Sequence, residues 1–465
     1  MRRAMAERST ERFEGAFDEE TEVLIIGGGP GGSTTAARLA QRGRRAIVLE
    51  RARFPRFHIG ESLLPSSYPV LDAMGLVPQL DEKFVRKYSA RFLDDEGDLD
   101  QDASRARYQF DEAFPPALPH AWEVSRDEFD ELLLRNAARL GADVREGWRV
   151  GRVLFDGETA IGVEATDREG VARRIRTRVI VDATGRDGLL TRRGAPGSSA
   201  QRLPQLDKTA MFTHVHGGHR SPGIDAGQIE IVILAGKNDD GTTTGWGWFI
   251  PFKDGRSSVG FVLSSEVVKK RLDDLRRPLG EGAGPSPREY EERPAETQRR
   301  LAAVFEQEVA RSPWMKRLIG EAPRLGEVRA AADYSFRVPT LAGDGWLAVG
   351  DAAGFLDPLF STGAHLAIGG GDRAAAAIDA ALAAGDVRRE RFEPYATSLR
   401  AAADLFLGAV QSFYRGDLRA LLFAKEQRTA LRRTITSMLA GDVFHDGPAP
   451  ALWAGYFRER FPAAL

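Results

Sequence analysis

A glycine-rich turn near the start of the chain constrains the fold more than any other feature. Glu22–Ile26 is an apolar, mostly β-branched run that predicts a buried strand, and Gly27-x-Gly29-x-x-Gly32 follows it at once. In such a turn the first glycine makes the tight bend and the second lets the backbone approach a pyrophosphate. The third lets a helix pack closely on the strand, and the N–H groups at that helix's N-terminus face the phosphates.

The segments after the turn complete a strand–turn–helix–strand unit. A predicted helix ends at Gly43, and a second strand, Arg45–Leu49, ends on Glu50, where a carboxylate would bond a ribose hydroxyl. The alternative is a glycine turn with a purely structural role, but the helix, the second strand and the acidic residue all accompany it. We therefore predict a Rossmann-type domain that binds a dinucleotide.

The composition excludes several kinds of site and partner. The 465 residues contain no cysteine, which excludes disulfides, zinc–thiolate sites and cysteine nucleophiles. The absence of cysteine fits a cytoplasmic location. We also predict no metal site. The net charge of −2 gives no reason to expect nucleic acid or a membrane surface as a partner. No apolar run approaches the roughly 20 residues that span a bilayer. Residues 1–20 lack the apolar core of a secretory signal, so we expect a loose N-terminal leader.

The rest of the chain predicts an α/β protein with interleaved parts. Strand-like runs at about 140–181 and 205–264 are interpreted as an antiparallel sheet on the substrate side. The predicted units are a nucleotide-binding domain at 21–385, a substrate-domain sheet interleaved with it at about 85–125 and 205–335, and a C-terminal helical region at 386–465.

Three further segments narrow the choice of nucleotide. They are the start of a predicted helix, Ser125-Arg126-Asp127-Glu128-Phe129-Asp130, and two strands with small-residue ends, Val179–Gly185 and Trp346–Ala353. Together with the glycine turn they resemble the FAD-binding signature of the para-hydroxybenzoate hydroxylase-like flavoproteins over most of residues 20–385. The resemblance implies non-covalent FAD, with Arg126 on its diphosphate or adenosine side and Asp351 at its ribityl or pyrophosphate region. An ordinary helix N-cap is the alternative for Asp351.

A tryptophan-rich strand indicates which branch of these flavoproteins the chain resembles. The segment Gly245–Pro251 contains W-x-W-x-I-P, with Trp246, Trp248, Ile250 and Pro251 at its fixed positions, and it resembles the signature of flavin-dependent halogenases. In that family the rings separate the flavin from the substrate, so that a halide is oxidised and oxygen is not transferred directly. The alternative is that alternating aromatic residues simply pack a core.

A second segment resembles the same family and predicts an anion site. Phe355–Gly363 matches the pattern F-x-x-P-x-x-S-x-G, in which Pro358 contributes to the flavin site. Small residues that open a helix leave N–H groups unpaired, and we predict that Thr362 and Gly363 bind chloride or bromide through theirs. In related hydroxylases a turn at this place serves only the flavin, and that alternative stays open.

The resemblance also assigns a lysine and a serine. Phe57–Pro65 resembles the halogenase segment after the second strand, in which we assign Ser62 to the cofactor site. Downstream, Lys87 aligns with the family's active-site lysine. A lysine in a water-poor tunnel can hydrogen-bond hypohalous acid or become a haloamine, and either state directs the halogen to one carbon. The alternative is a solvated surface lysine, and Lys83 lies one helical turn away.

One departure from the family pattern bears on the substrate. Halogenases of free tryptophan have a glutamate before the Ser-Thr-Gly, whereas this chain has Phe360, which is more similar to phenol- and pyrrole-type members. The resemblance therefore implies an electron-rich phenolic or pyrrolic substrate, halogenated with reduced FAD and O2. A phenol needs no dedicated base; His58 is the candidate nearest the motifs, with a structural hydrogen bond as its alternative role. Since no second glycine fingerprint follows a strand, we expect a separate flavin reductase.

Two rival functions and one partner remain open from the sequence. The rivals are an aromatic hydroxylase or flavin reductase on the same fold, and a non-catalytic flavin-binding scaffold. The small aromatic substrate is either free or tethered to an acyl or peptidyl carrier protein. Basic residues of the C-terminal region could dock such an acidic carrier, or they could be solvated helix faces: Arg388, Arg389, Arg391, Arg400, Arg415, Arg419, Lys425, Arg428, Arg432 and Arg433.

Overall fold

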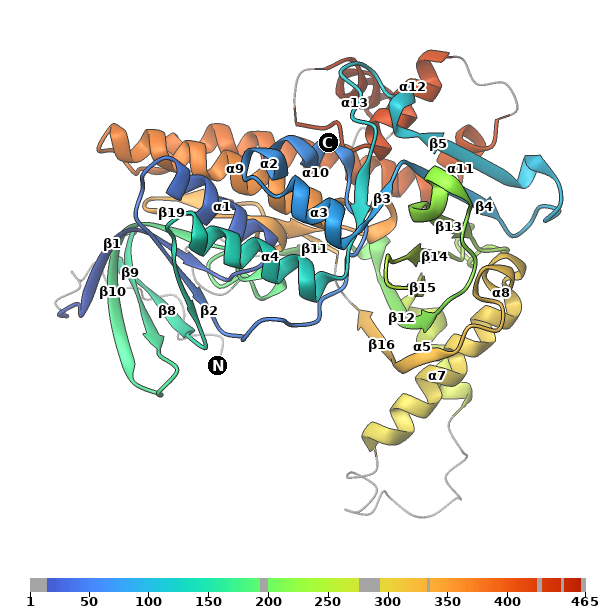
Figure 1. The fold of residues 1–465 in the computed structure, drawn as a ribbon, viewed down its shortest axis with the longest axis horizontal. Helices are drawn as coiled ribbons and strands as arrows, with labels where there is room; N and C mark the ends of the chain where they lie inside the picture. The colour runs from blue at the N-terminus through green and yellow to red at the C-terminus, as the bar shows by residue number, and fades with distance from the viewer. Residues whose placement is uncertain are drawn as a thin grey trace.

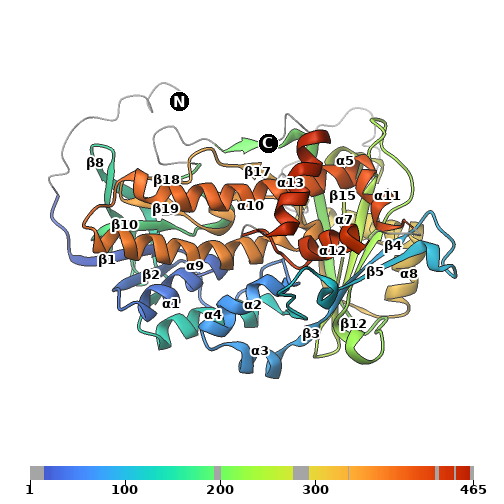
Figure 2. The same cartoon turned by 90° about the horizontal axis from the view of Figure 1, so that it is seen from above.

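Two β-sheets at opposite ends of the molecule are joined by long helices. The computed structural model describes residues 15–192, 200–275, 293–332, 335–424, 429–444 and 447–460. In Figure 1 the sheet that contains β1 lies on the left and the sheet that contains β12 lies on the right. Two neighbouring helices, α9 (Thr362–Ala383) and α10 (Arg389–Arg415), run along the molecule from one sheet toward the other (Figure 2).

The first sheet has eight strands and a parallel centre. Its central strands are ordered β18-β19-β10-β1-β2-β7, with β9 pairing β10 and β8 pairing β9. The strands are β1 (Glu19–Ile26), β2 (Ala46–Glu50), β7 (Asp143–Glu146), β8 (Arg149–Asp156), β9 (Thr159–Thr166), β10 (Ala172–Asp182), β18 (Ala342–Gly343) and β19 (Trp346–Ala348). Strands β2, β1, β10 and β19 are parallel, so the turns at their carboxyl ends meet at one edge of the sheet.

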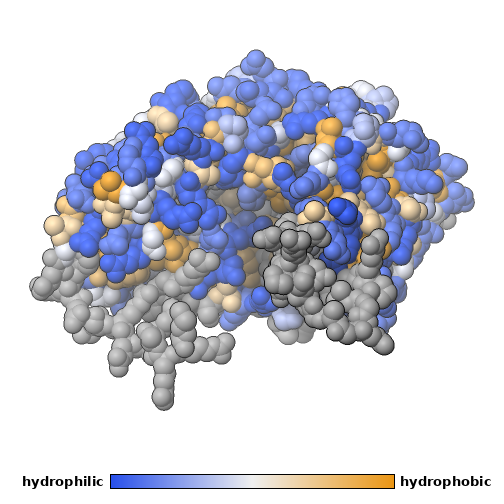
Figure 3. Space-filling view, turned by 90° about the horizontal axis from the view of Figure 1, so that it is seen from below, coloured by the Kyte–Doolittle hydropathy of each residue, from blue (hydrophilic) through white to orange (hydrophobic). Residues whose placement is uncertain are grey.

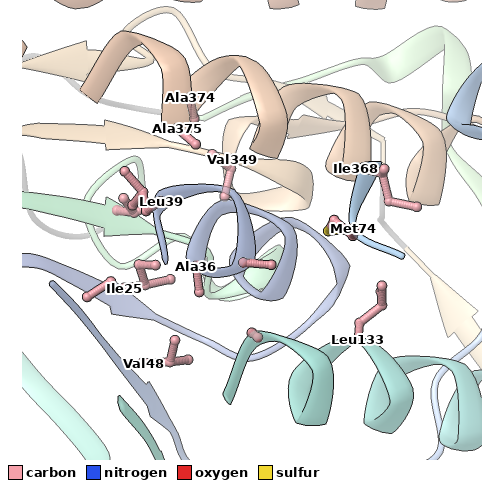
Figure 4. Packing of buried hydrophobic residues seen from close by; sticks show 14 of the residues in the cluster. Ile25, Ala36, Leu39, Val48, Met74, Leu133, Val349, Ile368, Ala374 and Ala375 are labelled. Atoms are coloured by element: carbon pink, nitrogen blue, oxygen red, sulfur yellow. The ribbon is translucent and has the colours of Figure 1, made fainter. Parts of the chain in front are cut away.

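Helix α1 (Pro30–Gln41) lies between this sheet and helix α9. Ala36 and Leu39 of α1 are completely buried, as are Ile25 of β1 and Ala374 of α9. Figure 4 shows the α1 side chains between those of the sheet and those of α9. Burial of apolar area is the main stabilising contribution to such a layered core. Helix α4 (Arg126–Arg139) also packs against α1.

The second sheet has seven strands and is antiparallel except for one pair. Its order is β16-β12-β15-β14-β13-β4-β5, and only β13 and β4 run parallel. The strands are β4 (Ser89–Asp94), β5 (Arg105–Gln109), β12 (Lys208–His216), β13 (Ile229–Ile233), β14 (Gly245–Pro251), β15 (Arg256–Ser264) and β16 (Arg324–Ala332). Two short sheets complete the described strands: β3 (Val85–Lys87) with β6 (Ala121–Glu123), and β11 (Gln201–Arg202), β17 (Phe336–Arg337) and β20 (Gly354–Phe355).

Helices cover both faces of the second sheet. One face packs on α7 (Arg293–Arg311) and α8 (Pro313–Ile319), and the other faces residues of α10 and α12. The remaining helices are α2 (Tyr68–Ala73), α3 (Val77–Lys83), α5 (Ser265–Asp274), α11 (Asp417–Leu422), α12 (Thr429–Leu439) and α13 (Pro448–Arg460). Among the described helices, none is both long enough and apolar enough to cross a membrane. The face in Figure 3 is accordingly mostly hydrophilic, with apolar side chains in small groups.

Two expectations from the sequence need correction. The strands at 143–182 belong to the first sheet and not to a sheet on the substrate side, because β7 pairs in parallel with β2 and β10 with β1. The predicted loose leader covered residues 1–20, of which residues 1–14 lie outside the described residues. Its end is not loose, because Glu19 and Glu20 belong to β1 and pair in parallel with β10.

Candidate active site

One cavity of about 790 Å³ brings together most of the residues singled out in the sequence. It extends from the carboxyl edge of the first sheet to the tryptophan-bearing face of the second. The predicted residues that line it are Gly27, Gly29, Glu50, Ser62, Arg126, Trp246, Trp248, Ile250, Asp351, Pro358, Thr362 and Gly363. Gly32, Pro251 and Lys87 lie outside this lining.

The three glycines of the turn have three different surroundings. Gly27 has a φ of +108°, and a Cβ there would lie 2.3 Å from the Ala183 carbonyl oxygen. A Cβ on Gly32 would lie 2.0 Å from the Gly27 carbonyl oxygen, so α1 can approach β1 only with a glycine at this position. A Cβ on Gly29 would meet only Arg56 Nη2, at 3.4 Å. Gly29 therefore borders open space in the cavity, where a pyrophosphate fits.

The Glu50 side chain holds the turn from the next strand. Its Oε2 accepts a hydrogen bond of 2.7 Å from the Gly28 N–H, and its Oε1 accepts one of 2.7 Å from the Ala52 N–H. The buried carboxylate lies beside the cavity at the end of β2. Each oxygen can accept more than one hydrogen bond, so Glu50 retains the capacity to bond a ribose hydroxyl.

Arg126 is more fully occupied within the protein than the sequence suggested. Its Nε and Nη2 donate to Asp130 at 2.7 and 2.9 Å, and its Nη1 donates to the Ile59 carbonyl at 2.8 Å. This geometry fixes the segment after β2 against α4. Arg56, which sequence reasoning missed, lies 3.3 Å from Asp130 and beside Gly29. Its guanidinium is a further cation at the cavity, which Arg51, Arg149 and Arg186 also line, and its position in the segment after the second strand was the available signal.

Asp351 lies in the turn after β19, on the opposite side of the cavity. Burial raises the pKa of this carboxyl to about 6, against the opposing effect of the positive charge on Arg126. Gly363 is close by, since a Cβ at that position would lie 3.9 Å from Asp351 Oδ1. Asp351 thus lies beside the predicted halide turn and lines the cavity, where it can accept hydrogen bonds from a ligand.

The two tryptophans form one wall of the cavity. They project from the same face of β14, because alternate residues of a strand share a face, and their rings lie 5.7 Å apart between centroids. Trp248 Nε1 donates to Ser258 Oγ at 3.0 Å. Its ring lies directly over Gly260 of the neighbouring strand, where a Cβ would come within 2.3 Å of it. Phe212 of β12 extends the same aromatic face, with its ring 6.2 Å from that of Trp248.

The predicted halide turn ends in a left-handed residue that starts a helix. Ser361 has a φ of +56° and precedes the first residues of α9. Thr362 and Gly363 are in the first turn of that helix, so their N–H groups have no acceptor within it. Asp357 fixes the turn: its Oδ1 accepts from the Leu359 N–H at 3.0 Å and its Oδ2 from the Tyr414 hydroxyl at 2.7 Å.

Lys87 is buried and lies behind the cavity wall at Ser62. Its side chain is 1% exposed, and its Nζ donates to Ser62 Oγ at 2.8 Å and to the Leu63 carbonyl at 2.9 Å. The alternative of a solvated surface lysine is therefore wrong for Lys87. It fits Lys83, which is 46% exposed. Burial lowers the Lys87 pKa, while the carboxylate of Glu123 raises it.

Sequence reasoning also missed a carboxylate–histidine pair at the cavity. Glu61 is 2% exposed and lines the cavity, and its Oε1 lies 2.7 Å from His214 Nε2 of β12. His58, the candidate base, has its Nδ1 2.7 Å from the Ile59 carbonyl oxygen. Burial lowers the His58 pKa to about 4. His58 is therefore neutral at pH 7, and this short contact favours its structural role.

The lining suits a nucleotide cofactor better than a metal. A cavity near 800 Å³ is large enough for a cofactor of that class, and the donors and acceptors around it are backbone N–H groups, guanidinium groups and carboxylates. Within the described parts of the chain, no three histidine, aspartate or glutamate side chains are grouped as metal ligands would be.

Comparison with known proteins adds independent evidence. The model of the tryptophan halogenase family matches residues 22–94 and 99–429. A flavin-dependent halogenase of Armillaria mellea, armH3, is 32% identical over 88% of this chain and 77% of its own length. The 1H-pyrrole-2-carbonyl-[peptidyl-carrier protein] brominase of Pseudoalteromonas luteoviolacea (strain 2ta16) is 30% identical over 78% of this chain and 79% of its own.

A solved structure agrees with these relatives. The flavin-dependent brominase Bmp2 superposes with a TM-score of 0.78 at 27% identity, covering 95% of this chain and 99% of its own.

Proposed function

The chain belongs to the tryptophan halogenase family, and on that premise we propose that it is an FAD-dependent halogenase of an electron-rich phenol or pyrrole. The observation that carries the proposal is the single cavity that joins the glycine turn, the tryptophan wall and the N-terminus of α9. A hydroxylase, which transfers oxygen directly to its substrate, would not need the tryptophan wall.

The residues of the first sheet fit the two ends of the cofactor. The open space at Gly29 and the guanidinium of Arg56 suit the pyrophosphate, Glu50 the adenosine ribose, and Asp351 the ribityl hydroxyls. When bound, reduced FAD would give two electrons to O2, and the partly reduced oxygen would then oxidise a bound halide to hypohalous acid. Asp351, ionised above about pH 6, accepts hydrogen bonds from the hydroxyls and so holds the cofactor beside α9.

The residues of the second sheet and α9 control what happens to the halide. The N–H groups of Thr362 and Gly363 hold the anion, aided by the partial positive charge at the start of a 22-residue helix. The rings of Trp246 and Trp248 exclude water and keep the organic substrate away from the cofactor. Lys87, at Ser62 on the cavity edge, directs the hypohalous acid to one carbon of that substrate.

Phe360 supports an aromatic substrate that activates its own ring. Its side chain is 2% exposed and packs in the apolar cluster between the second sheet and α10, so it supplies no acid or base. A phenol or pyrrole releases electron density from its own heteroatom, and the ring needs no dedicated carboxylate at this position.

We also propose two partners, a separate flavin reductase and a carrier protein that presents the substrate. The carrier is supported by the pyrrolyl-carrier brominase among the relatives. For the basic residues of the C-terminal region, ion pairs within the chain support solvated helix faces over a docking surface, and Lys425 and Arg428 lie outside the described residues. Six of the arginines are ion-paired within the chain: Arg388 and Arg391 with Asp386, Arg389 and Arg400 with Glu393, Arg419 with Asp94 and Glu96, and Arg432 with Glu112.

Mass spectrometry of the reaction products tests this function. The protein is supplied with FAD, a reductase, O2 and bromide over a panel of phenols and pyrroles, each free and as a carrier-linked acyl group. We expect a bromine isotope doublet in at least one product, and product without the reductase when FAD is reduced chemically. Oxygen insertion without bromination would make the chain a hydroxylase. Product from the free substrates alone would remove the carrier.

A further inference from the structure

A buried glutamate lies on the strand beside Lys87, and no feature of the sequence indicated a role for it. Glu123 ends β6, which pairs with β3, and Lys87 ends β3; in that register Lys87 lies opposite Ala121 and Glu123 opposite Val85. Both side chains are almost completely buried, at 0% and 1% exposure. Two ionisable groups of opposite charge are thus buried on neighbouring strands, without a direct ion pair between them.

Ser62 connects the two residues. Its backbone forms a β-bridge with Glu123, and its hydroxyl accepts the hydrogen bond from Lys87 Nζ. The flanking backbone bonds, Leu63 N–H to the Trp122 carbonyl and Val124 N–H to the Glu61 carbonyl, hold this segment against β6. Ser62 also lines the cavity, so the pair lies directly behind the cavity wall.

Neither carboxylate oxygen of Glu123 makes a hydrogen bond of ordinary geometry with any described residue. A buried carboxylate without such bonds is costly to keep charged, and a buried ammonium is costly as well. Burial raises the pKa of Glu123 to about 8, while Lys87 and the Ser62 hydroxyl lower it. The two groups therefore influence each other: the positive charge of Lys87 lowers the Glu123 pKa, and the negative charge of Glu123 raises the Lys87 pKa.

Lys87 has a free position for a ligand. An ammonium has three N–H donors, and two of them are used by Ser62 and Leu63. The Phe110 ring, with its centroid 5.3 Å from Nζ, covers one side of the amine. No described residue accepts a hydrogen bond from the third donor, and Ser62, which lines the cavity, is the nearest contact between this amine and the cavity.

We propose that Glu123 is a positioning residue that keeps a proton on the buried Lys87–Glu123 pair, and that Lys87 gives this proton to hypohalous acid. The inference rests on the proposed role of Lys87. In the step, the O–X bond breaks and a C–X bond forms to the substrate ring. The hydroxyl oxygen takes the proton from Lys87 and leaves as water, and the proton released by the ring returns to the pair. The sum is ArH + HOX giving ArX + H2O.

The charges around the pair are paired with other partners. Arg86 on β3 is bound to Asp81, and Asp81 also accepts from Trp122 Nε1. Glu61 is paired with His214, and it raises the pKa of Glu123 from the other side. The pKa of His120 is lowered by its burial, so this ring carries no charge at neutral pH.

The sign of the expected pH effect follows from the coupling. Because the carboxylate raises the Lys87 pKa, Glu123→Gln leaves a lysine that loses its proton at a lower pH. Halogenation needs the proton, so the decline of kcat at high pH should move down by at least about one pH unit, and acid should restore activity. Glu123→Asp, which keeps the negative charge, should return the decline of kcat at high pH most of the way to its wild-type position.

Two measurements test the proposal. The first is kcat against pH for the wild type, Glu123→Gln, Glu123→Asp and a control, Glu230→Gln, whose buried carboxylate pairs with Arg91 instead of a lysine. The second is an NMR titration of protein labelled with ¹³C at lysine Cε, without turnover, in which Lys87→Arg identifies the Lys87 signal. Of these variants, we expect only Glu123→Gln to lower both the pH at which kcat declines and the Lys87 pKa measured by NMR.

The outcomes separate this inference from the proposed function. If Lys87→Arg halogenates at the wild-type rate, the role of Lys87 is wrong and the function must be revised. If Lys87→Arg is inactive but Glu123→Gln has the wild-type pH dependence of kcat and the wild-type Lys87 pKa, only the role of Glu123 is wrong. A rate that rises with pH through the Lys87 pKa would also overturn it, since the neutral amine would then be the reactive form.

Discussion

His214 Nε2 lies 2.7 Å from Glu61 Oε1, although the two residues are 153 positions apart in the chain. The bond joins the segment after β2 to the second sheet, and therefore the cofactor side of the cavity to its aromatic wall.

His214→Ala should destabilise the protein by about 1–3 kcal/mol, because it leaves a buried carboxylate oxygen without its partner. The measurement is the free energy of unfolding by urea, monitored by tryptophan fluorescence. His216→Ala, an exposed position on the same strand, is the matched control and should change the stability by less than about 0.5 kcal/mol. Equal effects of the two variants would mean that the contact contributes nothing.

Gly29→Val should fold normally and lose FAD. The residue has a φ of −70°, which valine adopts, and only the end of the Arg56 side chain is near the new Cβ. The side chain would instead occupy the space of the pyrophosphate, so we expect an affinity at least about a hundredfold weaker, or 2.7 kcal/mol. Flavin absorbance after gel filtration measures it, with Gly455→Val as a control in open space. Stoichiometric FAD in Gly29→Val would contradict our placement of the pyrophosphate.

Lys87→Ala should reduce halogenation by at least about a hundredfold, the usual contribution of one proton donor in a transition state. Oxygen consumption by the reduced enzyme should continue, since the lysine acts after the halide is oxidised. The readouts are product by mass spectrometry and oxygen by electrode. Lys83→Ala, an exposed lysine four residues away, should retain both.

Asp351→Asn should separate stability from function. The folded protein holds a proton on this carboxyl up to about pH 6, above the usual value, so the ionised form destabilises the cofactor-free fold at higher pH. The variant should therefore be more stable by about 1 kcal/mol at pH 8 and unchanged near pH 4. Its FAD affinity should fall about tenfold at pH 8, where the wild type has its carboxylate acceptor. Thermal melting with and without FAD tests both effects, and an unchanged FAD affinity would remove Asp351 from the cofactor site.

Local patterns predicted a large part of this site. The turn at Gly27 and the acidic end of β2 are set by backbone chemistry within about 25 residues, so the sequence contains all the information needed. Trp246 and Trp248 share a face because of strand alternation alone. The i,i+4 spacing of Arg126 and Asp130 is compatible with their ion pair, and the role of Arg126 on the diphosphate or adenosine side of FAD stays a prediction.

Contacts set by tertiary structure were not predictable in the same way. Alternation indicates a strand but not the sheet that it joins, which is why 143–182 was assigned to the wrong side. The Glu61–His214 and Lys87–Glu123 pairs depend on strand register across distant segments. A carboxylate in a sequence reads as a surface charge until its neighbours are known.

Helix α9 begins at the proposed halide turn and passes α1 so closely that a Cβ on Gly371 would lie 2.8 Å from the Gly31 carbonyl oxygen. A helix is stiff along its axis, so the distance between the halide turn and the phosphate-binding turn is fixed by the length of its first turns. Neither site can be displaced without the other. Phe212 of β12 belongs to the aromatic wall but not to this helix contact, so a new substrate can be accommodated by replacing side chains on β12 while the oxidising centre stays the same. Redesign of substrate choice in this protein should therefore begin on β12 and leave residues 361–371 untouched.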